Sequence, residues 1–160
     1  MPIPVHALNV PPDLAFEFFV MFSRLEFALK ACGYGCVSAQ NGIDINWARF
    51  AREATPAFDL AATPALRSAV EYLLADPPKK EVIRHNRLDW DAALPGEHEP
   101  QLHGLAIFVR RVRNNLFHGG KFVRPESIDP DRDAKLVTAS LRVIEALAQA
   151  QPNVWEAFNG

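Results

Sequence analysis

Apolar residues recur at intervals of three and four along most of the chain, and no convincing strand pattern accompanies them. This periodicity is typical of amphipathic helices that bury one face. It predicts helices over residues 13–32, 44–54, 64–75, 101–117 and 130–150, with a short helical turn around Trp155 and Phe158. We therefore expect an all-α helical bundle of about five helices.

The ends of these helices carry recognisable signals. The expected N-terminal residues are Asp13, Asp44, Thr63 and Asp129, whose side chains can accept hydrogen bonds from the first turn. Gly33 is expected to end the first helix. Residues 33–43 and 79–100 are irregular or polar and are expected to be loops, the second with one helical turn around Trp90.

The helix expected over residues 13–32 is apolar on nearly every side. Its five phenylalanines are Phe16, Phe18, Phe19, Phe22 and Phe27. A helix of this kind is buried either in a core or against a partner chain. A bundle of this size would leave some of these rings exposed, so we expect a homodimer.

Composition fits one ordinary globular domain covering residues 1–160. The chain is 49% hydrophobic and 22% charged, and its formal net charge of −2 excludes a molecule that binds polyanions over its whole surface. It has no apolar run long enough for a membrane span and no signal-peptide pattern at its N-terminus. Two cysteines cannot form a disulfide framework, which favours a reducing compartment. From these features together we expect a cytoplasmic protein without membrane contact.

One charged residue falls within the apolar stripe of helix 101–117. The stripe consists of Leu102, Leu105, Ala106, Val109, Val112 and Leu116. On a helical wheel Arg113 lies roughly 20° from Leu102, whereas Arg111 points the opposite way, into solvent. Because arginine stays charged, Arg113 requires an anion or a wet cleft. It is either an internal ion pair with an acid such as Glu26 or a cleft residue that binds an anionic ligand.

The same region is strongly basic. Between Pro100 and Pro125 the chain has no acidic residue but carries Arg110, Arg111, Arg113, Lys121 and Arg124. Such clustering indicates a polyanion-binding patch, with a solvated basic face as the alternative. His118 lies in the last helical turn, one turn after Asn114, where a histidine either caps the helix or takes part in chemistry.

The segment Arg113-Asn114-Asn115-Leu116-Phe117-His118-Gly119 resembles the R-x4-H motif of the HEPN superfamily, the higher-eukaryote and prokaryote nucleotide-binding domains. The resemblance implies a dimeric helical bundle whose two motifs meet in a cleft. It also implies a metal-independent endoribonuclease without cofactors, acting as a toxin or defence effector and in some cases restrained by an antitoxin protein.

Carried onto this chain, the resemblance makes Arg113 and His118 catalytic, with Asn114 orienting them and Glu26 supporting Arg113. The basic residues expected to contact RNA are Arg110, Lys121 and Arg124. The chemistry agrees, because RNA cleavage through its own 2′-OH needs a proton acceptor near neutral pH and a fixed cation on the phosphate. The alternatives are a non-catalytic HEPN-like module that binds a nucleotide or a protein, and a purely structural helical adaptor.

Overall fold

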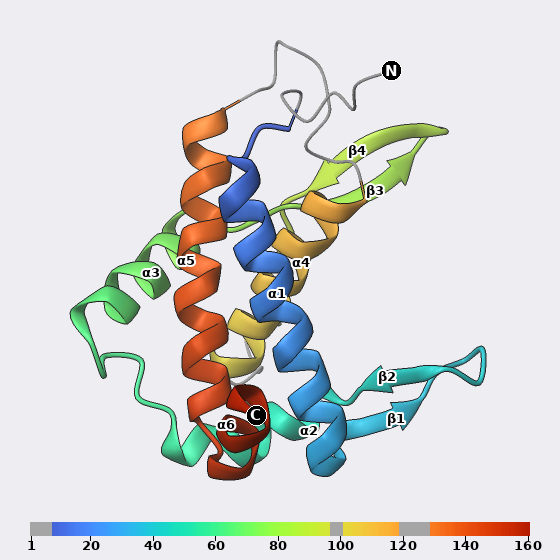
Figure 1. The fold of residues 1–160 in the computed structure, drawn as a ribbon. Helices are drawn as coiled ribbons and strands as arrows, with labels where there is room; N and C mark the ends of the chain where they lie inside the picture. Colours follow the sequence, from blue (N-terminus) through green and yellow to red (C-terminus); the bar gives the residue numbers. More distant parts are fainter. Residues whose placement is uncertain (1–7, 97–100, 119–128) are drawn as a thin grey trace.

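The computed structural model describes residues 8–96, 101–118 and 129–160. Within these ranges the fold is mostly helical (Figure 1). Its α-helices are α1 (Pro12–Leu29), α2 (Trp47–Ala54), α3 (Pro64–Ala75), α4 (Gln101–Phe117), α5 (Pro130–Gln149) and α6 (Pro152–Asn159). Two antiparallel hairpins accompany them, formed by β1 (Gly35–Val37) with β2 (Ile43–Ile45) and by β3 (Lys80–Arg84) with β4 (Arg87–Asp91). The expected bundle of helices is therefore confirmed, but the expectation of an all-α chain is wrong.

Helix α5 is the centre of the bundle, because α1, α3 and α4 all pack against it. Its fully buried side chains include Val143, Ile144 and Leu147. Helix α6 closes one end of the bundle by packing on α1, and α2 packs on α4. The two hairpins extend from opposite ends of the helical bundle (Figure 1).

Two of the four N-terminal caps expected from the sequence are present in the structure. The side chains of Thr63 and Asp129 accept hydrogen bonds from backbone N–H groups in the first turns of α3 and α5, at 3.1 and 3.0 Å. The cap expected at Asp44 is wrong, because Asn46 takes that position and its Oδ1 accepts from Arg49 N–H at 3.0 Å. Asp13 lies inside the first turn of α1 and makes no capping hydrogen bond.

Helix α1 ends at Leu29 and is followed by one π-helical turn (Lys30–Tyr34), within which the backbone leaves the helical conformation at Gly33, the residue expected to end the helix. Gly33 has a φ of 85°, in the left-handed region where a residue without Cβ is favoured. The chain then runs straight into β1, so residues 33–43 hold a strand and a turn where an irregular loop was expected.

The β3–β4 hairpin replaces most of the loop expected over residues 79–100, and Trp90 belongs to β4 rather than to a helical turn. A two-residue turn joins the strands, with φ of 51° at His85 and 58° at Asn86. Positive φ at both positions is characteristic of the tight turns that match strand twist. Each strand has only five residues, many of them charged, which hides the alternation that marks longer strands.

Helix α1 is not buried on every side within one chain. Phe18 and Phe22 lie in the core, but the exposed fractions of Phe16, Phe19 and Phe27 are 67%, 50% and 62%. Phe117, at the end of α4, is 43% exposed and meets Phe19 edge-on at 5.8 Å between ring centroids. We call Phe16, Phe19, Phe27 and Phe117 the aromatic face.

Across the described residues, no helix combines the length and apolar character that crossing a membrane requires.

Candidate functional site

The C-terminal half of α4 divides into a core side and an accessible side. Val109, Val112 and Leu116 are buried, as the apolar stripe predicted. Asn114 and His118 are exposed, and Arg110 and Arg113 are half-buried. The accessible side chains of α4 thus lie beside the segments that approach the helix, which are α1, α2 and β3.

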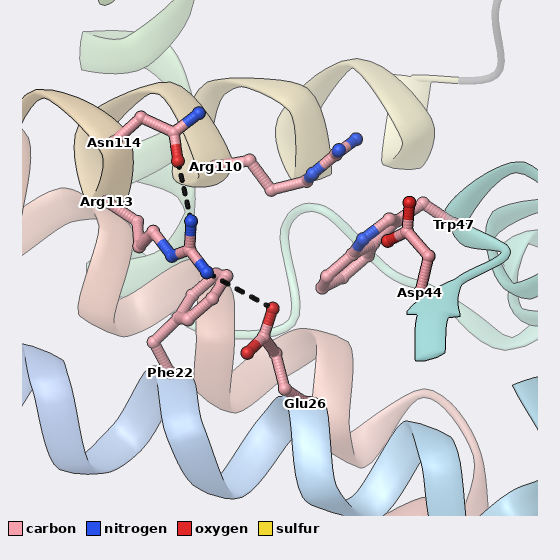
Figure 2. A pocket seen from close by; sticks show the side chains of 7 residues that line it. All are labelled: Phe22, Glu26, Asp44, Trp47, Arg110, Arg113 and Asn114. Atoms are coloured by element: carbon pink, nitrogen blue, oxygen red, sulfur yellow. Dashed lines mark hydrogen bonds and ion pairs between the residues drawn. The ribbon is translucent and has the colours of Figure 1, made fainter. Parts of the chain in front are cut away.

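The first pocket at this edge has a volume of about 130 Å³ and lies between α1, the start of α2 and α4. It is lined by Phe22, Glu26, Asp44, Trp47, Arg110, Arg113 and Asn114 (Figure 2). Two arginines face two carboxylates and two aromatic rings across it. Such a lining can hold a charged or hydrogen-bonding group of a ligand.

Arg113 is held from three sides (Figure 2). Its guanidinium lies 5.4 Å from the ring centroid of Phe22, its Nη1 donates to Oδ1 of Asn114 at 2.8 Å, and its Nη2 lies 3.8 Å from Oε1 of Glu26. The ion pair with Glu26 is therefore present, but at this distance it is longer than a hydrogen bond. With 34% of its side chain exposed, Arg113 keeps N–H groups that can reach an anion.

Arg110 forms the other basic wall of the first pocket. Its guanidinium lies 5.6 Å from the ring centroid of the buried Trp47, an attractive cation–π contact. Its side chain extends toward the side where Asp44 lies (Figure 2). Asp44 was expected only as a helix cap, so its place in the pocket follows from the β1–β2 hairpin that the sequence did not reveal.

His118 does not line the pocket that contains Arg113. It lines a second pocket of about 140 Å³, with Lys80, Glu81, Arg111, Asn114 and Asn115. The backbone N–H of His118 still donates to Asn114 O at 2.8 Å, so the last turn keeps its helical path. Asn114 is shared by both pockets and separates the side chains of Arg113 and His118.

Arg111 corrects the helical-wheel prediction, because it does not extend into solvent. The β3–β4 hairpin covers this side of α4, and Nη1 of Arg111 donates to Pro78 O at 3.3 Å. Burial lowers the pKa of the Arg111 guanidinium, while the charge of Asp91 opposes that shift. Sequence reasoning missed Lys80 and Glu81 as neighbours of His118; the available signal was the two-residue His85-Asn86 turn between two short β-prone runs.

Two of the expected RNA contacts, Lys121 and Arg124, lie outside the described residues. Within the described ranges, no group of three or more His, Cys, Asp or Glu side chains is placed to hold a metal ion.

Comparison of the chain with protein-family models, with curated proteins and with solved structures finds no match.

Proposed function

We propose that this chain is a HEPN-type, metal-independent endoribonuclease that works as a homodimer in the cytoplasm. The observation that carries the proposal is the arrangement at the end of α4. A half-buried arginine and an accessible histidine line adjacent pockets that meet at Asn114. Arg110 and Arg111 add positive charge on either side of that junction.

In the proposed reaction His118 accepts the proton of an RNA 2′-OH, and the 2′-oxygen forms a bond to the adjacent phosphorus. Arg113 stabilises the negative charge that builds up on the phosphate oxygens. The bond to the 5′-oxygen then breaks, that oxygen takes up a proton from water, and His118 releases the proton that it accepted to the solvent. The products are a 2′,3′-cyclic phosphate and a 5′-hydroxyl end, and the nucleophile comes from the substrate itself.

A second copy of the chain completes this site. Within one chain Arg113 and His118 open into different pockets, yet the reaction needs both on a single phosphate. A two-fold dimer can bring His118 of one copy toward Arg113 of the other. The aromatic face suits that contact because Phe117 directly precedes His118, and exposed rings of this kind are typical of interfaces.

The decisive experiment is RNA cleavage by the purified full chain in the presence of EDTA. We expect the wild type to cut RNA and leave cyclic or 3′-phosphate ends, and His118→Ala to reduce the rate by about 10²–10⁴. His85→Asn is the matched control, since it removes an exposed histidine at the hairpin tip and asparagine tolerates the φ of 51° there. Equal cleavage by His118→Ala and wild type would show that the mechanism is wrong.

A wild type that cuts no RNA but is stabilised by a nucleotide would instead favour the non-catalytic binding module. The observation that favours this alternative is the polar first pocket, in which Arg113 is paired with Glu26. A role as a toxin or defence effector with an antitoxin partner remains a prediction from the motif.

A further inference from the structure

The β3–β4 hairpin is anchored to α4 at the point where it passes His118. The two backbone carbonyls directly before β3 accept hydrogen bonds from α4. Pro78 O accepts from Nη1 of Arg111, and Lys79 O accepts from Nδ2 of Asn115 at 2.8 Å. Asn115 is almost fully buried, so the donor side of this second contact is shielded from water, whereas Lys79 is exposed. The following residue, Lys80, is thereby held at the pocket that His118 lines.

The charges in this second pocket do not balance. Lys80 and Arg111 are cationic, and Glu81 is the one carboxylate among the described residues that line it. Arg111 is half-buried, and within the described part of the chain no carboxylate lies within ion-pair distance of it, although Asp91 acts on it from further away. A cation withdrawn from water without a paired anion is costly, and an anionic ligand would offset that cost.

We propose that the second pocket, with Lys80 and Arg111 as its ligands, binds an RNA phosphate next to the one that is cleaved. This inference rests on the proposed ribonuclease function and deepens it. The first and second pockets share Asn114, so a strand crossing the end of α4 meets both with successive phosphates. Arginine binds phosphate through its planar fork of N–H groups, and lysine adds a point charge.

The test measures binding of a 2′-O-methyl RNA oligonucleotide, which lacks the nucleophile and cannot be cut, to the full chain over a range of salt concentrations. We expect Lys80→Ala to weaken binding by about three- to tenfold. The slope of log affinity against log salt should become shallower by about 0.7, the value for one phosphate contact with a single strand. Arg111→Gln should do the same.

Arg87→Ala is the control, because Arg87 is also exposed but lies on β4 beside the hairpin turn and outside the second pocket. It should leave the slope unchanged. Arg111 also anchors the hairpin, so Lys80→Ala, which removes an exposed side chain, is the decisive variant. The phosphate site would be overturned if Lys80→Ala kept the salt slope of the wild type, or if Arg87→Ala changed that slope as much as Lys80→Ala does. It would also be overturned if the wild type did not bind the oligonucleotide.

Cleavage assays on the same proteins separate the two proposals. A shallower slope for Lys80→Ala with no cleavage of any RNA by the wild type would keep the phosphate site and refute the ribonuclease. Metal-independent cleavage by the wild type together with an unchanged salt slope for Lys80→Ala would keep the ribonuclease and refute the phosphate site. Competition by inorganic phosphate at constant ionic strength distinguishes a strand phosphate from a free one, and we expect it to displace the oligonucleotide only weakly.

Discussion

Replacing Arg113 by alanine tests the proposed chemistry most directly, provided that the variant still folds. The contacts of Arg113 allow the stability cost to be worked out. Its cation–π contact with Phe22 and its hydrogen bond with Asn114 are each worth about 0.5–1 kcal/mol at a partly exposed position. The 3.8 Å ion pair with Glu26, with both side chains about a third exposed, adds at most about 1 kcal/mol.

Arg113→Ala should therefore lower the free energy of unfolding by about 1–3 kcal/mol, below the roughly 5–15 kcal/mol of a typical domain. RNA cleavage should fall by about 10²–10³ because the cation that stabilises the transition state is lost. The two effects differ enough to be separated: urea unfolding measures the first, and cleavage in EDTA measures the second.

Arg113→Lys is the control, since it keeps the charge but loses the two-pronged geometry of the guanidinium. We expect near-normal stability and a cleavage rate still well below that of the wild type. Normal cleavage by Arg113→Ala would refute the catalytic role. A loss of stability above about 4 kcal/mol would instead show that Arg113 is chiefly a structural residue.

The remaining predictions concern assembly and stability. Light scattering should give a mass of about twice 17.8 kDa for the wild type and the monomer mass for Phe19→Asp. The control Ile83→Asp, which changes an exposed residue of the β3–β4 hairpin, should stay dimeric. A monomeric wild type would show that the proposed two-copy site does not form. Ser140 Oγ is fully buried and finds no hydrogen-bond partner among the described residues, so Ser140→Ala should raise the free energy of unfolding by about 1 kcal/mol in urea, and a decrease would contradict this account. Hydrogen bonds from Arg132 lower the pKa of Asp76 in the folded protein. They therefore stabilise the fold fully at pH values above the unfolded carboxyl pKa of about 3.9, and this stabilisation is lost as the pH falls through the lower pKa of the folded state. Asp76→Asn should thus lower the free energy of unfolding by about 1 kcal/mol at pH 7, a value discounted for the partial exposure of Asp76, and by progressively less below about pH 4. A loss of stability that does not change with pH would show that the charge of Asp76 is not responsible.

The sequence alone predicted the helices whose signals are local. The bounds of α4 match the expected range of residues 101–117, and α5 ends within one residue of its expected end. Apolar periodicity fixes which face of α4 is buried, and the caps at Thr63 and Asp129 act within one turn of their own helices. The motif at the end of α4 could be located for the same reason, since it needs only one helix.

Tertiary structure decided what surrounds that motif. A helical wheel predicts the direction in which Arg111 points around the axis of α4. It does not predict that a hairpin beginning some thirty residues earlier covers that side of the helix. Likewise, Arg113 meets Glu26 only because α1 and α4 lie together in the bundle, and Lys80 reaches His118 only because Asn115 holds the hairpin. Periodicity in a sequence records how a segment divides its surface between core and solvent. Which charged groups then share a pocket depends on packing between segments that are distant along the chain, and the sequence pattern carries no direct record of it.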